Sequence, residues 1–423
     1  MNINDLVLVS IDDHVVEPPN MFDGRLAAKY VDDAPRVVKD DNGVDRWMYR
    51  GNQTGVVGLN AVVSWPKTEW GFDPTGFDEM RPGSYDIHAR VRDMDVNGIT
   101  ASMCFPTFAG FSAGHFRHVK DETTNAVIRA YNDWHIEDWC GAYPDRFLPL
   151  SIVPSWDPPA AVAEIKRVAA KGAKAITLPE LPHIDGLPSY HDMDHWGPIF
   201  EAMIDNGLVM CLHIGQGFAA LQLAPDGPVD NLMIMACQIS MLGAQDLLWG
   251  PAFRKYPELK VAFSEGGIGW LPFYLDRCDR HFTNQVWLHG QDDFGGKLPS
   301  EVFREHILAC YITDPSGLLL RHRIGIDIIA WECDYPHTDT TWPESPEHAW
   351  GELQGAGCSD EEIHKITWEN ACRFFDWDPF EHTSREDATV GALRARARAA
   401  DVDVTRMPRA EWKKRNEAAG IGV

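Results

Sequence analysis

Eight short apolar segments rich in β-branched residues recur along this chain, and amphipathic stretches separate them. The segments are residues 6–14, 99–107, 147–156, 173–180, 208–215, 259–267, 306–314 and 326–337. Most are continuous apolar runs rather than alternating ones, which is typical of parallel strands covered on both faces. Strand–helix alternation repeated eight times predicts an α/β fold, a (β/α)₈ TIM barrel. The alternative is a doubly wound sheet, which we disfavour because no glycine-rich phosphate motif follows the first strand.

Helical patterns fill the intervals between these strands. Residues 121–141 carry large apolar side chains at helical spacing. Residues 157–172 open with an aspartate and two prolines and close on Gly172, the usual order of helix start and stop signals. Residues 196–207 close in the same way on Gly207. We therefore expect helices at these three places.

Two segments lie outside this repeat. We expect residues 1–384 to form a single barrel domain, since such barrels reach more than ~400 residues with insertions. Residues 40–85, rich in Gly, Trp, Asn and Pro, predict a β-hairpin or lid inserted after the first strand. Residues 385–423 carry nine Lys or Arg and six Asp or Glu, which predicts a C-terminal helical arm on the barrel or on a neighbouring subunit. A solvated, frayed tail is the alternative.

Charge and cysteine content limit the partners and the compartment. The formal net charge of −25 argues against nucleic acid or an anionic membrane as the main partner. Nine cysteines without a CxxC pair indicate reduced thiols in a cytoplasmic protein and no Cys₄ zinc site. The N-terminus has no signal-peptide pattern, and we expect no apolar run of the ~20 residues that span a bilayer.

The strand ends contain the residues that could perform chemistry, because the active site of this fold lies at the carboxyl ends of its strands. The first strand ends with Asp12 and His14, which leave an extended chain on the same face, whereas Asp13 points the other way. Alone, such a pair is usually a turn or a helix cap; at a strand tip it favours metal binding. Glu17 either orients His14 or lies on the surface.

Three further strands also end in ionisable residues. His213 closes a strongly apolar run, so it is either a satisfied core histidine or a ligand, and the GQG sequence after it favours a ligand. Asp334 follows the eighth strand and is either a metal ligand and proton acceptor or a helix cap. Glu265 follows the sixth strand and is an acid, a base, a substrate contact, a weak ligand or a cap.

The mixed nitrogen and oxygen donors predict a mononuclear metal site. Asp12, His14, His213 and Asp334 suit Zn²⁺ best, with Mn²⁺ or Fe²⁺ as alternatives. The fourth strand ends in Pro179 and Glu180 rather than lysine, so no carboxylated lysine is available to bridge two ions.

Seven ordered motifs resemble the amidohydrolase 2 group, which includes aminocarboxymuconate-semialdehyde decarboxylase and resorcylate decarboxylase. They are DDHVVEP (12–18), RVRDMDVNGI (90–99), CFPTF (104–108), CLHIG (211–215), SEGGIGWLPFYLDRCD (264–279), CDYPHTD (333–339) and ENACRFF (369–375). The resemblance implies a TIM barrel with one metal held by Asp12, His14, His213 and Asp334, and it implies that His337 contacts substrate. This chain departs from better-studied relatives at Glu265, where they have a histidine.

The sequence is compatible with three functions. The first is a metal-dependent hydrolase in which Asp334 moves protons, Glu265 orients substrate or shares the acid–base role, and His337 stabilises a developing oxyanion. The second is a non-oxidative decarboxylase of an aromatic or unsaturated acid. The third is a barrel that only binds a ligand. Trp47, Trp65, Trp70 and Phe72 of the predicted lid hint at an apolar or aromatic small-molecule substrate, unless they pack on the barrel. We also expect a homodimer or larger assembly.

Overall fold

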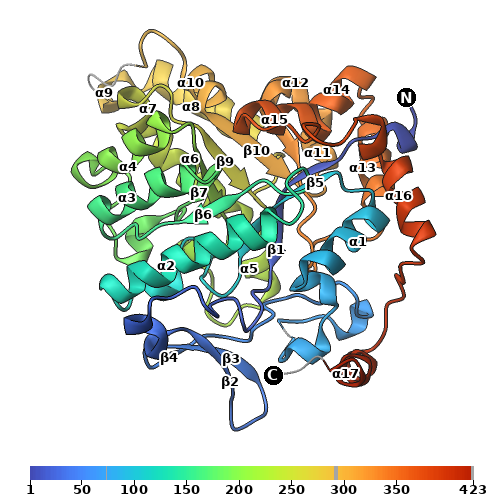
Figure 1. Cartoon of the computed structure of the whole chain (residues 1–423). Coiled ribbons are helices and arrows are strands. Elements are labelled where there is room, and N and C mark those ends of the chain that lie inside the picture. The colour runs from blue at the N-terminus through green and yellow to red at the C-terminus, as the bar shows by residue number, and fades with distance from the viewer. Residues whose placement is uncertain (73, 290–293, 421–423) are drawn as a thin grey trace.

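Parallel strands form the centre of the molecule and helices surround them (Figure 1). The computed structural model describes residues 1–72, 74–289 and 294–420. Each of the eight predicted strand segments coincides with one strand of a parallel sheet, and β1 alone among them runs one residue past its predicted end. The strands are β1 (Val9–Val15), β5 (Ala101–Pro106), β6 (Leu150–Ile152), β7 (Ala175–Thr177), β8 (Val209–His213), β9 (Val261–Ser264), β10 (Ile307–Tyr311) and β11 (Ile329–Trp331). Strands β6 to β11 pair in sequence order in one sheet, and β1 pairs with β5 in another. The chain therefore has an α/β fold with parallel sheets.

Backbone contacts link the two sheets at both ends. A parallel bridge joins Ser102 on β5 to Phe147, just before β6. On the other side, the Asp334 N–H donates to the Asp12 carbonyl (2.7 Å) and the His14 N–H donates to the Tyr335 carbonyl (2.7 Å). The strand pair β1–β5 thus lies between the first and last strands of the larger sheet.

Alternate side chains of these strands enter two separate apolar clusters. One cluster receives residues from every parallel strand, namely Val9, Ile11, Ala101, Met103, Phe105, Leu150, Ala175, Val209, Cys211, Ala262, Leu308, Cys310 and Ala330. The residues between them, such as Met210 and Phe263, pack with the helices in the larger cluster. This division follows from the two-residue period of a strand and explains why the runs are apolar throughout.

Helices occur at all three predicted places. Residues 121–141 form α2 (Glu122–Trp134) and a π-helical turn (His135–Cys140), and residues 157–172 form α3 (Pro158–Ala169). Helix α4 (Met193–Asp205) begins three residues earlier than predicted, because Asp192 caps it by accepting the N–H groups of Asp194 and His195.

The remaining helices are α1 (Ile87–Asn97), α5 (Asp230–Met235), α6 (Cys237–Trp249), α7 (Ala252–Lys255), α8 (Leu271–Asn284), α9 (Val286–His289), α10 (Pro299–His306), α11 (Pro315–Leu319), α12 (Arg321–Ile324), α13 (Ser345–Gly355), α14 (Asp360–His364), α15 (Asn370–Phe375), α16 (Val390–Ala399) and α17 (Arg409–Ala418).

The segment after β1 contains the predicted hairpin. Strands β2 (Arg36–Lys39), β3 (Asp45–Tyr49) and β4 (Asn52–Gln53) form an antiparallel sheet, which starts four residues before the predicted boundary. Short 3₁₀ turns follow, among them η4 (Phe77–Glu79). Trp47 and Trp65 are fully buried, whereas Phe72 is 61% exposed. Two of the four aromatic residues that the sequence analysis connected with substrate therefore belong to the core.

The C-terminal segment packs on its own chain. Helix α16 contacts α1, and α17 contacts η4. Trp412 is buried against Val62 and Trp65, and the Asn416 side-chain amide donates to the carbonyls of Asp78 (2.9 Å) and Met80 (2.8 Å). Figure 1 shows α17 at the same end of the molecule as β2, β3 and β4.

The cysteines and one apolar helical stretch bear on the expectations of reduced thiols and of no bilayer-spanning run. All nine cysteines are unpaired, and Cys237 alone among them is not buried. Contrary to the expectation from the apolar runs, the helical stretch Asp230–Trp249 is long and apolar enough to meet the composition of a bilayer-spanning helix. A single stretch of this kind also occurs in the cores of soluble proteins, so it is weak evidence for a membrane.

Candidate metal centre

A β-bulge determines which side chains of β1 reach the centre of the strands. Ser10 pairs with Ser102 and Asp13 pairs with Cys104, so β1 has one extra residue between these pairs. Ile11 belongs to the central cluster, and unbroken alternation would send Asp13 there next. The bulge shifts the alternation, and His14 Nε2 lies 3.6 Å from Asp12 Oδ1. Asp13 instead accepts hydrogen bonds from the Ser102 hydroxyl and the Tyr335 N–H.

His213 ends β8 on the same face as Val209 and Cys211 of the central cluster. Its Nδ1–H faces the Ile214 carbonyl, which leaves Nε2 free to act as an electron-pair donor. Nε2 lies 3.0 Å from His14 Nε2 and 3.3 Å from Asp12 Oδ2. Two imidazole nitrogens at this separation need a proton or a cation between them.

Asp334 continues the inward face of β11 beyond Ala330. Its backbone has a φ of +56°, a left-handed conformation that costs an aspartate free energy and that clusters at functional sites. Its Oδ1 lies 3.4 Å from His14 Nε2. The helix-cap alternative is wrong, because the next helix, α13, begins only at Ser345.

The donor atoms of Asp12, His14 and His213 lie close enough together for one cation, and Asp334 approaches this group beside His14. Two donors each ~2.1 Å from one ion lie ~3.0–3.4 Å apart at the angles of octahedral and tetrahedral coordination. The separations here run from 3.0 to 3.6 Å. Both oxygens of Asp12 and Oδ2 of Asp334 are buried without a hydrogen-bond partner. Such atoms fit a metal ion, because unpaired buried polar groups are otherwise costly.

Electrostatics favours the same interpretation. Burial, reinforced by the Asp334 carboxylate, raises the pKa of Asp12, and burial with Asp339 raises the pKa of Asp334. Burial, with His337 and His213 nearby, lowers the pKa of His14 and keeps its imidazole neutral. A bound cation would lower the pKa of the two carboxyl groups again, because it stabilises their charged form. A neutral imidazole such as that of His14 is the form that binds a metal.

His337 lies against this group. Its ring stacks on His14 with centroids 3.9 Å apart, and its Nδ1 lies 2.9 Å from Asp334 Oδ1. Burial lowers the pKa of His337 to about 3, so its imidazole is neutral. The donor geometry also allows His14, Asp334 and His337 to bind an ion together.

Glu265 follows β9 directly and faces His213. Its Oε2 lies 3.5 Å from His213 Nε2, and its N–H donates to Glu332 Oε1 (3.0 Å). Like Asp334, it has a left-handed backbone, with a φ of +60°. The alternative that Glu265 caps the next helix is wrong, because the Asp314 carboxylate accepts the N–H groups of Ile268 and Gly269 before α8.

Both sequence interpretations of Glu17 are wrong. The residue is fully buried rather than on the surface, and its carboxylate accepts the N–H groups of Thr107 (3.0 Å) and Phe108 (2.7 Å) rather than a proton from His14. Burial raises the pKa of Glu17 to about 7. Glu17 therefore supports the loop after β5.

A pocket of about 640 Å³ opens beside these residues. Residues that line it include Asn60, Phe72, Phe111, Ile214, Phe218, Met233, Ile234, Glu265, Thr313, Glu332, His337, Thr338 and Asp339. Sequence reasoning missed Phe111, whose ring centroid lies 4.2 Å from that of His213. It also missed Glu332, although a carboxyl group inside the apolar run IIAWEC was a usable signal. Of the four aromatic residues first connected with substrate, Phe72 reaches the pocket.

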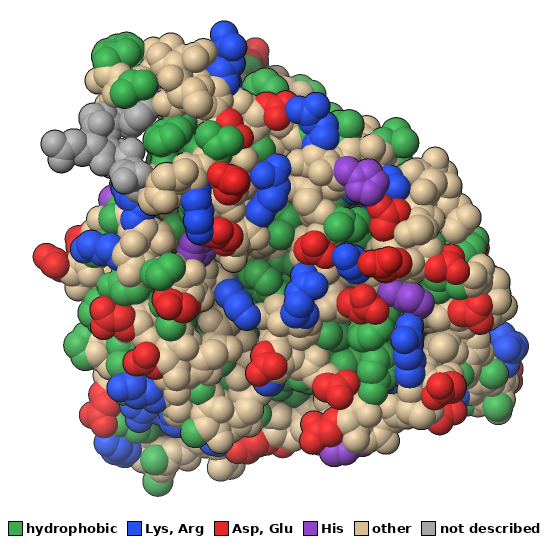
Figure 2. All heavy atoms as spheres, turned by 90° about the horizontal axis from the view of Figure 1, so that it is seen from above, with side chains coloured by type: hydrophobic (Ala, Val, Ile, Leu, Met, Phe, Trp, Pro, Cys, Tyr) green, Lys and Arg blue, Asp and Glu red, His purple; other side chains and the backbone are tan. Residues whose placement is uncertain are grey.

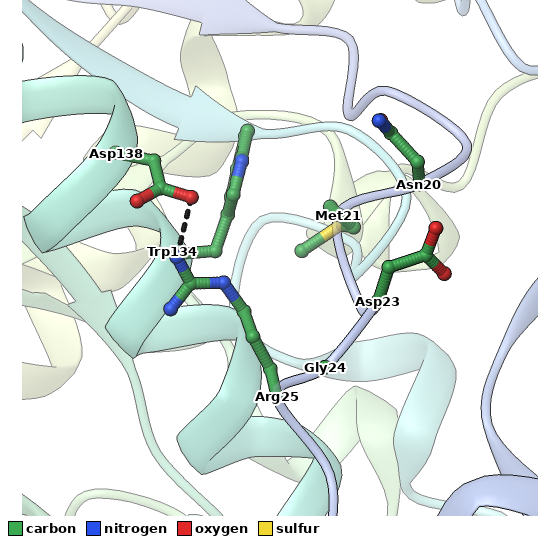
Figure 3. Close-up of a pocket in the computed structure, with 7 residues that line it drawn as sticks. All are labelled: Asn20, Met21, Asp23, Gly24, Arg25, Trp134 and Asp138. Atoms are coloured by element: carbon green, nitrogen blue, oxygen red, sulfur yellow. Dashed lines mark hydrogen bonds and ion pairs between the residues drawn. The ribbon is translucent and has the colours of Figure 1, made fainter.

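A second hollow of about 540 Å³ has no relation to these donors. It is lined by Asn20, Met21, Asp23, Gly24, Arg25, Trp134 and Asp138 (Figure 3). Its main contact is the ion pair between Arg25 and Asp138. The pocket beside His213 is therefore the candidate active site.

Comparison with known proteins places the chain among enzymes. The family model described as "Amidohydrolase" matches residues 33–377. The solved structure of an amidohydrolase from Mycobacterium avium subsp. paratuberculosis K-10 shares 22% identity at a TM-score of 0.69, covering 87% of this chain and 99% of that chain. For 5-carboxyvanillate decarboxylase from Sphingomonas paucimobilis the values are 20%, 0.60, 88% and 100%. For a dihydroxybenzoic acid decarboxylase from Polaromonas sp. JS666, solved with manganese and 2-nitroresorcinol, they are 18%, 0.57, 88% and 97%.

Proposed function

The chain belongs to the amidohydrolase family of metal-dependent enzymes, and on this premise we propose that it is a metal-dependent hydrolase of a small, largely apolar substrate. The observation that carries the proposal is the convergence of Asp12, His14 and His213, whose donor atoms are close enough to share one ion. Asp334 Oδ1 lies 3.4 Å from His14 Nε2, and both Asp12 oxygens lack a hydrogen-bond partner. Buried carboxylate and imidazole groups that lie this close together without hydrogen-bond partners are typical of a cation site and not of an apolar core.

We also propose how the chain is divided into a barrel domain, a lid and a C-terminal arm. We infer that residues 1–384 form a closed (β/α)₈ barrel domain, since all eight parallel strands contribute side chains to one central cluster. Within residues 40–85, Asn60 and Phe72 line the pocket, which supports a role for this segment as a lid. Residues 385–423 would be the C-terminal helical arm, and its contacts with η4 would hold that lid in place.

Asp12, His14, His213 and Asp334 would hold one divalent ion, for which the mixed donors favour zinc, with manganese or iron as alternatives. Such an ion lowers the pKa of a water ligand from ~15.7 toward ~7. Because the two carboxylates must be deprotonated to bind it, the affinity for metal should fall as the pH is lowered.

The chain's own residues would then orient substrate and move protons. Asp334 Oδ2 has no hydrogen-bond partner, so it is free to take a proton from the attacking water and return it to the leaving group. Glu265 lines the pocket at 3.5 Å from His213 and would orient substrate or share the proton transfer. His337 Nε2, buried and unpartnered, would contact the reacting group.

A decarboxylase is the second candidate. Two of the solved relatives described above are decarboxylases by name, and the same donor set could bind an aromatic acid through its oxygens. Their low identity supports a shared fold rather than a shared reaction. Family membership disfavours the third alternative, a barrel that only binds a ligand.

Product analysis on zinc-loaded protein separates the two reactions. We expect aryl esters, lactones or amides to be hydrolysed, with activity lost on chelation and restored by one equivalent of metal. Aromatic acids should release no CO₂. Release of CO₂ from an acid, without hydrolysis of any neutral substrate, would contradict the hydrolase proposal and leave the metal centre standing.

We also propose that the chain forms a homo-oligomer and that it is located in the cytoplasm. Large apolar side chains are exposed around α8 and α9, with exposed fractions of 70% for Phe273, 76% for Trp287 and 54% for Leu288. Acidic and basic side chains are interspersed on the face shown in Figure 2. Since exposed apolar surface favours association, light scattering should give at least twice the mass of one chain. The mass of a single chain would refute this expectation.

A further inference from the structure

We propose that the pocket beside the metal centre selects an apolar substrate bearing a hydrogen-bond donor or a positive charge, and excludes substrates with a free carboxylate. This inference rests on the proposed function only in taking that pocket as the substrate site. It concerns the class of substrate, and it distinguishes the hydrolase from the decarboxylase by a property other than turnover.

The charged side chains that line the pocket are all acidic. They are Glu265 and Glu332 deep in the pocket and Asp339 at its exposed rim. Among the described residues that line it, none is Lys or Arg. A substrate carboxylate would therefore find no side-chain cation to pair with, and pairing of this kind is what makes burial of a carboxylate tolerable.

Glu332 contributes an unpaired carboxyl oxygen to the lining of the pocket. It has no exposed surface, and Oε1 is held by the Glu265 N–H at 3.0 Å. Its Oε2 has no hydrogen-bond partner, and the residue lines the pocket. A buried oxygen in this state calls for a donor, which a substrate hydroxyl, amide or ammonium group would supply.

Arg90 is the guanidinium packed behind β1, and it is directed elsewhere. It donates to the Gly83 carbonyl at 2.6 Å and to the His14 carbonyl, and its guanidinium lies 4.5 Å from the centre of the Tyr335 ring. Its N–H donors are therefore used by backbone carbonyls, and Arg90 is not among the residues that line the pocket.

A bound metal ion does not give the pocket a net positive charge. A divalent ion bound by Asp12 and Asp334 makes a group without net charge, so it leaves no excess positive charge to attract a substrate carboxylate. The rest of the wall is apolar, with Phe111, Ile214 and Phe218 in the lining. The pocket thus combines an apolar wall with hydrogen-bond acceptors, which suits a ring or chain that carries a donor.

Fluorescence titration with three naphthalenes of equal size tests this selection. The probes are 2-naphthylmethylamine as its ammonium ion, 2-naphthylmethanol and 2-naphthoate, each with zinc-loaded and with metal-free protein. We expect the ammonium and alcohol probes to bind about tenfold or more tightly than naphthoate in both forms. Naphthoate binding as tightly as the alcohol in either form would overturn the proposal.

Matched variants connect the selection to the acidic groups. Glu332→Gln should lower the ammonium-to-naphthoate affinity ratio about tenfold, and Asp339→Asn should lower it by a smaller factor. Asp327→Asn, at an exposed aspartate paired with Lys365, should leave the ratio unchanged. If Glu332→Gln does not fold, Asp339→Asn alone decides, and an unchanged ratio in it contradicts the proposal. Because the readout is binding, a failure to hydrolyse esters would leave this result interpretable.

Discussion

Replacement of Asp334 by asparagine should lower kcat/KM by at least about a thousandfold while the protein stays folded. The substitution keeps the size of the side chain but removes the negative charge that faces His14 at 3.4 Å. It also removes the proton acceptor, and general acid–base catalysis alone contributes ~10²–10⁴-fold. The measurement is steady-state kinetics on zinc-loaded protein, with circular dichroism as the check on folding.

The matched control for this experiment is Asp327→Asn. Asp327 precedes β11 and its carboxylate is largely exposed and paired with Lys365, so its removal should change neither activity nor thermal stability measurably. Full activity in the Asp334→Asn variant would remove Asp334 from the mechanism. A loss of activity in both variants would instead indicate that the effect is not specific to the site.

Replacement of His213 by alanine should release the metal and abolish turnover. His213 Nε2 is the donor that lies closest to both His14 and Asp12, at 3.0 and 3.3 Å. Mutation of a group that only orients a metal ligand typically costs ~10–100-fold in affinity, so loss of a ligand itself should cost more. Elemental analysis should fall from about one zinc per chain to a small fraction of it.

His191→Ala is the control for this loss. The His191 side chain is half exposed, near Asp246 and away from the donor group, so the variant should keep both its metal and its activity. Stoichiometric zinc and full turnover in His213→Ala would show that His213 is not a ligand. Zinc retained with turnover lost would leave His213 a catalytic role without a binding one.

Much of the fold could be predicted from local patterns. The eight strands were located because each is a short β-branched apolar run, and burial on both faces requires that composition. Helix α3 was located by Asp157, whose side chain accepts the Ala160 N–H as a cap should. Helix α4 was placed too late because the cap at Asp192 lies in a polar stretch that resembles a loop.

The site was only partly predictable. His213 and Asp334 stood out as ionisable residues at the ends of apolar runs, and the structure brings both to within 3.4 Å of His14. Glu17 was misjudged because its partners, the N–H groups of Thr107 and Phe108, lie ninety residues away along the chain. For Trp47 and Trp65 the packing alternative is correct, since both are buried in the core. The sequence left both alternatives open because aromatic composition does not distinguish a pocket wall from an interior.

The sequence by itself determined the order of strands and helices and the donor types at the strand ends, because periodicity and capping are local properties of the chain. Only the tertiary structure decided which donors meet. The extra residue of β1 between its pairings with Ser102 and Cys104 turns Asp12 and His14 inward and Asp13 outward, and a bulge exists only where two strands pair. The acidic lining of the pocket likewise arises from Glu265 after β9 and from Glu332 and Asp339 after β11, and no local pattern brings these two segments together.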